Sequence, residues 1–501
     1  MDMSWFQRSS IIRSISVPGN FLALDLGAES GRAIVGTLDN GVLNLTETHR
    51  FLNNPIMASD GLHWDVNSLW NEIQIGIRKS AAQFQLSSLA LDAWGVDFAL
   101  LDHQGELLEN PFHYRDSRTD GMLDIAISRI SRKQVFDQTG NQFLQINTLF
   151  QLLALAENQP ALLKKAATFL TIPDLFNYWL TGAKVCEFTN ATTTQCFDPI
   201  KRDWAKPLLE TLHIPTRMFP QIVEPGNNLG NMVSELTVQV GVDKLPVIAP
   251  ACHDTGSAVV AVPADNRDFV WLSSGTWSIM GIETDSPCLD QKALDFNFTN
   301  EGGVFGTWRL SKNIMGLWLI QECKREWGVS YDEIAQLASE AQPFIAVIDP
   351  DDDIFLRSGG MINRIQKYCE QKQQNVPNTI GEISRVIFES LSLKYRFILD
   401  RLEQLTNKKL SPIHIIGGGT QNRLLNQFTA DSTNRKVISG PVEATAIGNI
   451  LMQAITLGQI VDMPDARAIV RNSFQPGYFQ PNHSNDWDEA YKKLLRLGNY
   501  E

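Results

Sequence analysis

The sequence predicts a mixed α/β protein of two domains, and three observations support this fold class. The chain has 501 residues, of which 43% are hydrophobic and 20% charged, and such a composition and length are typical of globular proteins with more than one domain. Each half opens with two apolar runs of strand length around a tip of small residues. A segment rich in proline, glycine and asparagine, residues 224–244, separates the halves. We therefore expect domains at residues 20–248 and 249–490.

The first half combines strands with a helical region. Residues 21–26 (FLALDL) and 33–38 (AIVGTL) predict a hairpin whose tip is GAESGR, residues 27–32. Residues 87–102 contain two further apolar runs around Trp94-Gly-Val-Asp97. Leucines three and four positions apart predict helix over residues 147–180. The chain returns to a strand at residues 245–250.

The second half repeats the strand–tip–strand pattern with different residues. Residues 269–272 and 277–282 are apolar and enclose Ser-Ser-Gly-Thr, residues 273–276, which indicates a faint internal duplication. A third tip, GGGTQN, follows the apolar run 413–416 and precedes a predicted helix. The polar tract 349–378 predicts a surface loop and an exposed helix. Its carboxylates at 349–353 lack the alternation of a calcium-binding loop, so we favour the loop over a cation site.

Charge and cysteine content exclude several classes of function. A formal net charge of -13 repels polyanions, so we expect neither nucleic acid nor a membrane as a partner. The six cysteines form no C-x-x-C pair, which argues against a metal cage or disulfide scaffold and favours the cytoplasm. Residues 1–20 predict a loose extension, with a transit peptide as the alternative, and no later run is long enough to span a bilayer.

The three tips suit phosphate binding, because small residues let backbone N–H groups approach phosphate oxygens. The alternative for each tip alone is a simple tight turn. The sequence contains no Walker A motif and no dinucleotide-binding glycine pattern, which disfavours those two nucleotide-binding folds.

Asp254 is a single carboxylate between two apolar runs, 246–252 and 258–262. Two interpretations remain open from spacing alone. Asp254 or Thr255 could cap the following helix, or Asp254 could act as a general base where a strand ends at a cleft.

These motifs together resemble the FGGY family of carbohydrate kinases, from about Phe21 to Asp486. Asp25 to Arg32 resembles the first phosphate loop of the family, residues 272–278 (LSSGTWS) its second, and residues 417–422 its adenosine motif, in the family's order. Segments 92–98, 114–118, 189–195, 253–255 and 312–318 resemble a branch of the family that acts on a ketose.

The resemblance implies two ribonuclease-H-like (actin-like) domains that face each other across a cleft. It also implies ATP-dependent phosphorylation of a ketose, L-rhamnulose in the first place, with L-fuculose, D-xylulose or a non-catalytic nucleotide- or sugar-binding module as alternatives. The implied site residues are Asp254 as general base; Gly95, His253, Thr255 and Asn313 for the sugar; Ala28, Glu29, Ser30, Gly31, Arg32, Thr276, Gln321 and Gly418 for ATP; and Asp25 for Mg²⁺ or its waters.

One position departs from the family pattern. Glu29 stands in the first phosphate loop where a small hydroxyl residue is usual, and a carboxylate near a triphosphate weakens binding unless it faces water or Mg²⁺. We therefore expect the loop to act through its backbone. Trp94, Trp277 and Trp318 are interpreted as core residues, with stacking on the sugar as the alternative.

Overall fold

The computed structural model describes residues 19–482, 484–498 and 500 of the chain. The prediction of a loose N-terminal extension over residues 1–20, with its transit-peptide alternative, lies outside the described residues for positions 1–18. It is wrong for Gly19 and Asn20, which belong to strand β1 (Gly19–Leu26) because they pair with Leu38 and Thr37. In the described part of the chain, no helix is both long and apolar enough to cross a bilayer.

The first half of the chain builds a six-stranded sheet in the order β13-β14-β6-β1-β2-β3. The hairpin predicted for residues 21–38 is confirmed, because β1 and β2 pair antiparallel, with Gly19 opposite Leu38 at one end and Leu26 opposite Gly31 at the other. Alternate residues of β1 enter different cores: Leu22 and Leu24 face one layer of helices, and Phe21 and Ala23 face the other. The strands of this sheet are β1 (Gly19–Leu26), β2 (Ser30–Asp39), β3 (Val42–Leu52), β6 (Ser88–Ala93), β13 (Asn227–Asn231) and β14 (Pro246–Ala249).

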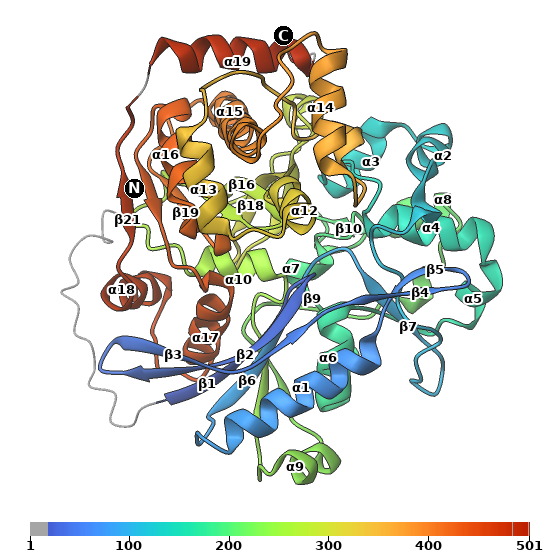
Figure 1. The fold of residues 1–501 in the computed structure, drawn as a ribbon. Coiled ribbons are helices and arrows are strands. Elements are labelled where there is room, and N and C mark those ends of the chain that lie inside the picture. The colour runs from blue at the N-terminus through green and yellow to red at the C-terminus, as the bar shows by residue number, and fades with distance from the viewer. Residues whose placement is uncertain (1–18, 483, 499, 501) are drawn as a thin grey trace, which may run out of the picture.

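Helices α1 (Val66–Ala81) and α6 (Ile172–Thr181) cover the outer face of this sheet, with the short α9 (Ser234–Val240) beside α1 (Figure 1). Ile73 and Ile77 of α1 are buried one turn apart, which is the spacing expected of a helix with one apolar face. Asp65 caps α1 by accepting a hydrogen bond from the N–H of Ser68.

The second half builds a seven-stranded sheet in the order β17-β18-β16-β15-β19-β20-β21. The predicted strands at 269–282 and 413–416 are confirmed, and the helix after the third tip is α16 (Arg423–Thr433). The long helix α15 (Ile380–Thr406) packs against this sheet and against α16. The strands are β15 (Val270–Ser274), β16 (Trp277–Thr284), β17 (Thr299–Gly302), β18 (Trp308–Met315), β19 (Ile413–Ile416), β20 (Val437–Ser439) and β21 (Gly477–Phe479).

The two sheets share one topology. In the first, β3, β2 and β1 run antiparallel and are followed by the parallel strands β6 and β14. In the second, β18, β16 and β15 run antiparallel and are followed by the parallel strands β19 and β20. The predicted internal duplication is therefore present, and it has the form expected of two ribonuclease-H-like domains.

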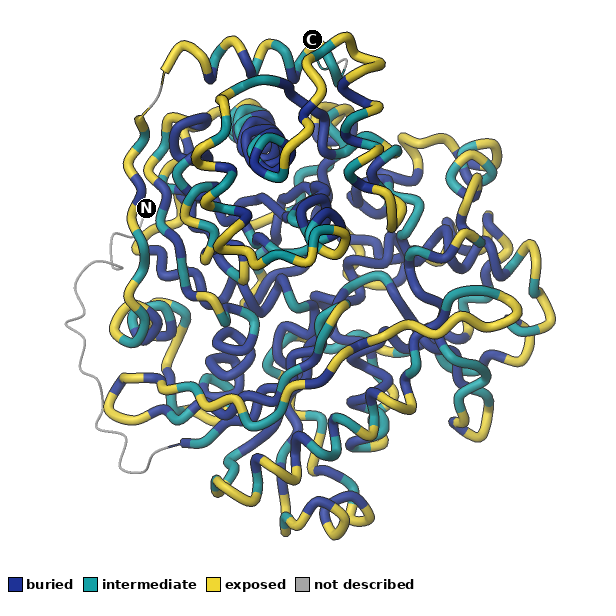
Figure 2. The backbone as a smooth tube through the Cα atoms, viewed as in Figure 1, coloured by how far each residue is buried: buried dark blue, intermediate teal, exposed yellow. Residues whose placement is uncertain are grey.

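A pair of helices joins the two sheets. Helix α10 (Asp254–Val260) packs against α17 (Ala444–Thr456), and both contribute to a core that also contains Phe21 of β1 and Trp271 of β15. Figure 2 shows this junction as a continuous buried region. The change from one sheet to the other falls between β14 and β15, and the exact boundary at 248/249 stays a prediction.

Helix α17 is also tied to the first sheet by polar groups. Asn449 donates to the Asp92 carboxylate at 2.6 Å, and Gln453 donates to the carbonyl of Leu22 at 3.0 Å. A helix from the second half of the chain thus rests on the first sheet.

The prediction of helix over 147–180 is wrong for residues 168–171. These residues form strand β8, which pairs antiparallel with β7 from Phe98 to Leu101, so a tertiary partner overrides the local leucine pattern. The remaining elements of this half are β4 (Pro55–Ala58), β5 (Gly61–Trp64), β7 (Phe98–Leu101), η1 (Ser117–Thr119), α2 (Met122–Arg129), α3 (Arg132–Thr139), α4 (Thr148–Asn158), α5 (Pro160–Lys165), β8 (Thr168–Thr171), β9 (Cys186–Glu187), α7 (Phe188–Ala191), β10 (Phe197–Asp198), β11 (Asp203–Trp204), α8 (Lys206–Thr211), η2 (Thr216–Met218) and β12 (Ile222–Val223).

The polar tract 349–378 is only partly the surface segment that its composition predicts. Lys394 is fully buried and forms ion pairs with Asp349 at 2.9 Å and with Asp351 at 3.0 Å, so the start of the tract belongs to the interior. The remaining elements are α11 (Gln291–Asp295), α12 (Trp318–Trp327), α13 (Tyr331–Glu340), η3 (Asp353–Phe355), α14 (Met361–Gln371), η4 (Gly418–Gln421), α18 (Met463–Ser473) and α19 (Asn485–Leu497).

Candidate active site

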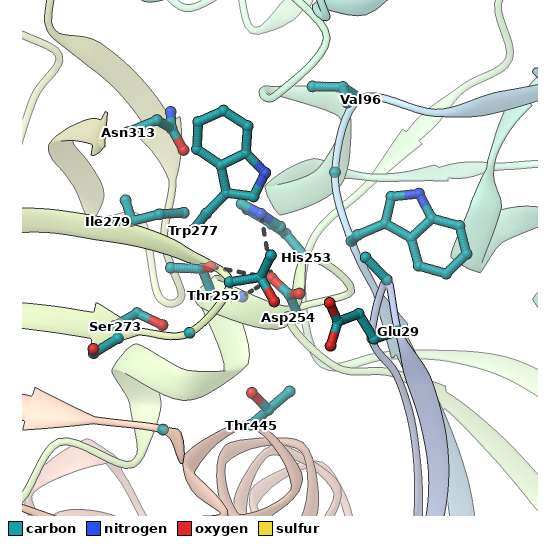
Figure 3. A pocket seen from close by; sticks show the side chains of 18 of the residues that line it. Glu29, Val96, His253, Asp254, Thr255, Ser273, Trp277, Ile279, Asn313 and Thr445 are labelled. Atoms are coloured by element: carbon teal, nitrogen blue, oxygen red, sulfur yellow. Dashed lines mark hydrogen bonds and ion pairs between the residues drawn. The ribbon is translucent and has the colours of Figure 1, made fainter. Parts of the chain in front are cut away.

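A cavity of about 570 Å³ takes its walls from both halves of the chain. Residues of the three glycine-rich tips line it, and the start of α10 contributes His253, Asp254 and Thr255. Figure 3 shows Asp254 between Glu29 of the first tip and Trp277 at the start of β16. The predicted site residues that line the cavity are Asp25, Ala28, Glu29, Ser30, Arg32, Gly95, His253, Asp254, Thr255, Thr276, Asn313, Gln321 and Gly418.

Gly31 is the predicted nucleotide residue that does not line the cavity. It lies inside β2, and a Cβ atom at this position would stand 2.2 Å from the ring of Phe51. The glycine is therefore needed for packing against Phe51, which is a structural reason for its presence in the loop motif.

The first tip is held by a residue that the sequence analysis did not select. Asn53 donates through its side chain to the carbonyl of Gly27 and through its backbone to the carbonyl of Glu29, both at 3.0 Å. Within the tip, the N–H of Gly27 donates to the carbonyl of Ser30 at 3.0 Å. These bonds make the tip a rigid backbone turn.

Arg32 connects the first tip to the second half of the chain. Its guanidinium donates to the carboxylates of Asp25 and Glu443, and Glu443 is the residue directly before α17. Burial alone would lower the pKa of Arg32, but the charges of Asp25 and Glu443 outweigh burial and raise it. Arg32 is therefore a fixed cation beside the predicted metal ligand.

The second and third tips lie against each other. A Cβ atom on Gly419 would stand 2.0 Å from Oγ of Ser274, so only glycine allows this approach. Four buried polar atoms of cavity residues have no hydrogen-bond partner among the described residues: Oδ1 of Asn141, Oγ of Ser274, Oε2 of Glu301 and Oε1 of Gln321. Unpartnered polar atoms in a cavity are suited to a polar ligand.

Glu29 lines the cavity and forms an ion pair with a residue of the second half of the chain. Arg325 of α12 donates to its carboxylate at 3.0 Å, and the two side chains keep 46% and 55% of their surface exposed. This pairing gives the unusual carboxylate a partner other than phosphate. An ion pair this exposed contributes at most about 1 kcal/mol.

Asp254 is the first residue of α10, and the N-cap position belongs to His253. Oδ1 of Asp254 accepts hydrogen bonds from the backbone N–H and the hydroxyl of Thr255. The side chain keeps 31% of its surface exposed, and burial of its surroundings raises its pKa. The capping interpretation therefore does not describe Asp254, because its side chain does not occupy the N-cap position.

Behind His253 lies a buried ion pair that the sequence analysis missed. Arg309 of β18 and Glu301 of β17 approach to 3.1 Å, and their side chains are only 1% and 6% exposed. Burial alone would raise the pKa of Glu301, but the positive charge of Arg309 lowers it instead. The signal available in the sequence was the charged Arg309 between Trp308 and Leu310 in an apolar strand.

The predicted sugar residue Asn313 is held by Gln142, which was also missed. Oε1 of Gln142 accepts from the backbone N–H of Asn313 at 2.8 Å and from its side-chain amide at 3.2 Å. The Gln142 amide in turn donates to the carbonyl of Asn313 at 3.2 Å. Because its amide is engaged in this way, Asn313 has its side-chain oxygen left for a ligand.

Gly95 and two of the three tryptophans, Trp94 and Trp277, line the cavity. The indole of Trp94 is nearly buried and donates to Asp97 at 2.9 Å, whereas Trp277 is half-buried at the cavity wall. Trp318 is not a lining residue and donates to the carbonyl of Phe355 at 3.1 Å. Packing explains Trp94 and Trp318, and Trp277 remains available for contact with a ligand.

Two duplicated α/β lobes whose glycine-rich tips share a cavity with a carboxylate define a phosphotransferase of the actin-like fold class. Residues 20–261 match the model of the N-terminal domain of the FGGY family of carbohydrate kinases, and residues 270–457 match its C-terminal domain. The chain belongs to the FGGY family of carbohydrate kinases.

Relatives and solved structures agree with this assignment. The chain is 43% identical over 474 residues to a rhamnulokinase of Bacteroides thetaiotaomicron, covering 94% of this chain and 98% of the relative. It is 44% identical over 456 residues to a rhamnulokinase of Oceanobacillus iheyensis, covering 90% and 96%. The crystal structure of a ligand-bound xylulose kinase from Lactobacillus acidophilus superposes with a TM-score of 0.80 at 17% identity, covering 96% of this chain and 97% of the other. The predicted fold class is confirmed, and the roles of individual residues stay predictions.

Proposed function

We propose that this protein transfers the terminal phosphoryl group of ATP to L-rhamnulose and produces L-rhamnulose 1-phosphate. The observation that carries the proposal is the shared cavity, in which Asp254 faces three glycine-rich tips and the Asn313–Gln142 pair. The sugar identity is supported by rhamnulokinases that are 43% and 44% identical over at least 90% of this chain.

The residues present fit a nucleotide. The backbone of the first tip and the close contact of Gly419 with Ser274 leave room for phosphate oxygens to approach N–H groups. Gln321 and Gly418 line the cavity from different elements, and Oε1 of Gln321 has no partner among the described residues. We assign these groups to ATP.

The chemical step requires position and a proton acceptor. Phosphoryl transfer is catalysed mainly by holding the attacking hydroxyl in line with the phosphorus atom and by stabilising charge. The bond between the sugar oxygen and its proton breaks, and Asp254 accepts the proton while the oxygen attacks phosphorus and ADP leaves. The raised pKa of Asp254 moves its basicity toward the working pH.

We assign Mg²⁺ to Asp25, because this cation is usually held by one or two carboxylates together with substrate phosphates and waters. No cluster of three or more His, Cys, Asp or Glu side chains suited to a metal occurs in the described part of the chain, which agrees with a cation shared with the nucleotide. When bound, Mg²⁺ would neutralise phosphate charge. Arg32, already paired with Asp25, orients that carboxylate.

A substrate panel tests the proposal. ADP release is measured with L-rhamnulose, L-fuculose and D-xylulose, and we expect the highest kcat/KM for L-rhamnulose, because hydrogen-bonding sites discriminate strongly between sugars with different hydroxyl groups. A preference of tenfold or more for another ketose would show that the substrate assignment is wrong, while the assignment as a sugar kinase would stand. A thermal shift with ligands but no ADP release with any sugar would instead indicate the non-catalytic binding module.

We propose the cytoplasm as the site of action, because the reaction consumes ATP. The expected partners are the sugar and MgATP only.

A further inference from the structure

His253 lies between Asp254 and the buried ion pair of Glu301 and Arg309. Its Nε2 atom is 3.4 Å from Oδ1 of Asp254, and its Nδ1 atom is 3.0 Å from Nη2 of Arg309. The ring is buried, and Figure 3 shows it directly beside the Asp254 carboxylate. Nε2 therefore has one charged neighbour, Asp254, and Nδ1 has two, Arg309 and Glu301.

The Arg309 contact determines which nitrogen of the ring carries the proton. A guanidinium has only donors, so Nδ1 must accept if it bonds to Nη2. A neutral imidazole that accepts at Nδ1 carries its hydrogen on Nε2. That N–H then faces Oδ1 of Asp254. A doubly protonated ring would place two cations 3.0 Å apart with donors facing each other, which is unfavourable in a buried site.

A hydrogen bond between Nδ1 and Glu301 would give the other tautomer, with the hydrogen on Nδ1. Its Oε2 atom is 3.3 Å from Nδ1, and it could accept from Nδ1–H if the proton were there. However, Oε2 forms no hydrogen bond of acceptable geometry with any described residue, and it lies 3.1 Å from Nη2 of Arg309. Glu301 therefore balances the charge of Arg309, and Arg309 makes the hydrogen bond to the ring.

The donors around Asp254 all converge on one oxygen. Oδ1 accepts hydrogen bonds from the backbone N–H and the hydroxyl of Thr255, and it faces Nε2 of His253. Oδ2 has no hydrogen bond or ion pair with a described residue, and Asp254 lines the cavity. The carboxylate thus has one anchored oxygen and one free oxygen.

We propose that Arg309 is a positioning residue for phosphoryl transfer: by donating to Nδ1 it holds His253 as the Nε2–H tautomer, which turns the N–H toward Oδ1 of Asp254 and leaves Oδ2 to take the proton of the sugar hydroxyl. The proposal rests on the role of Asp254 as the base given under the proposed function. It adds the Arg309–Glu301 pair to the catalytic arrangement; Glu301 lines the cavity beside His253, and Arg309 does not.

The direct test is the tautomer of His253 in the wild-type protein. Selective ¹⁵N labelling of the eight histidines distinguishes a protonated from an unprotonated ring nitrogen by its chemical shift, and the His253→Gln variant assigns the signals. We expect an unprotonated Nδ1 and a protonated Nε2 at neutral pH. A protonated Nδ1 would overturn the proposal.

A kinetic test uses variants that remove both charges, so that no lone charge is left buried. Arg309→Met combined with Glu301→Met should lower kcat by about tenfold to a hundredfold, the scale seen when outer-shell partners of metal ligands are lost, with KM for ATP unchanged and the Nε2–H signal of His253 lost. The control is Arg385→Met with Glu389→Met, another buried pair at 2.7 Å on α15, which should leave kcat unchanged.

The outcomes separate this proposal from the proposed function. If Asp254→Asn keeps its turnover, the base assignment itself is wrong. If Asp254→Asn loses turnover but the double variant keeps both kcat and the Nε2–H signal, Arg309 has no positioning role. If the double variant does not fold, the wild-type tautomer decides.

Discussion

Replacement of Asp254 by asparagine separates chemistry from structure at the centre of the site. Asparagine keeps the shape of the side chain, and its carbonyl oxygen can accept the two hydrogen bonds that Thr255 donates to Oδ1. The amide nitrogen then takes the place of Oδ2, and an amide cannot accept the proton of the sugar hydroxyl. The substitution therefore removes the base and preserves the local fold.

The expected loss is large. General acid–base catalysis contributes about 10² to 10⁴ in rate, which corresponds to about 2.7–5.4 kcal/mol of activation free energy. We expect kcat to fall by about this factor while KM for ATP stays within a small factor of wild type. ADP release measured at saturating L-rhamnulose gives kcat, and titration of ATP gives KM.

The stability of Asp254→Asn should not fall with its kcat. Burial raises the pKa of Asp254, so its contribution to stability is present below the unfolded pKa and is lost as the pH rises through the folded pKa. At neutral pH the ionised side chain therefore disfavours folding, and asparagine relieves this. The thermal midpoint of Asp254→Asn should equal or exceed that of wild type at neutral pH, and the difference should shrink in acid.

The control is Asp290→Asn. Asp290 caps α11 by accepting from the N–H of Ala293 at 2.8 Å, does not line the cavity, and should tolerate asparagine with no change in kcat or thermal midpoint. If Asp254→Asn also keeps near-wild-type kcat, the reasoning from Oδ2 is wrong.

Three further predictions follow from buried and exposed contacts. Gln142→Ala removes the hydrogen-bond partner of Asn313. Because an unpaired buried polar group costs about 1–3 kcal/mol, kcat/KM for the sugar should fall by about five- to 150-fold while KM for ATP is unchanged. An equal effect on both substrates would contradict a role of Gln142 at the sugar site. Lys394→Met leaves Asp349 without its cation and should lower the free energy of unfolding by about 3–5 kcal/mol. Lys408 belongs to an exposed ion pair at 3.4 Å, so Lys408→Met should change that free energy by less than about 0.5 kcal/mol. Urea unfolding measures both variants, and equal stabilities would refute the argument from burial. Glu29→Ser should keep kcat within a small factor and lower KM for ATP slightly, because the Arg325 pair is half exposed; a large loss of turnover would show that the carboxylate takes part in the reaction.

Much of the fold could be predicted from local sequence. The hairpins around residues 27–32 and 273–276 and the turn at 417–422 are encoded by apolar strands that end in small residues, and the structure has them where they were expected. Most of the candidate site residues also meet in one cavity, because motifs at the ends of neighbouring strands lie at one edge of a sheet. Gly31 shows the limit of this approach, since a motif position can serve packing against Phe51 and not a ligand.

The sequence by itself determined the class of element at each motif, the duplication and the identity of the carboxylate at the start of α10. Only the tertiary structure decided which distant groups complete the site: Gln142 reaches Asn313 across 171 positions, Arg32 reaches Glu443 across 411, and Arg309 reaches the ring of His253. The same holds for strand β8, which its pairing with β7 imposes on a leucine-rich segment. Strand and turn preferences act over a few neighbouring residues, whereas the partners of a buried charge or amide are set by how separate elements pack, and local sequence does not encode that packing.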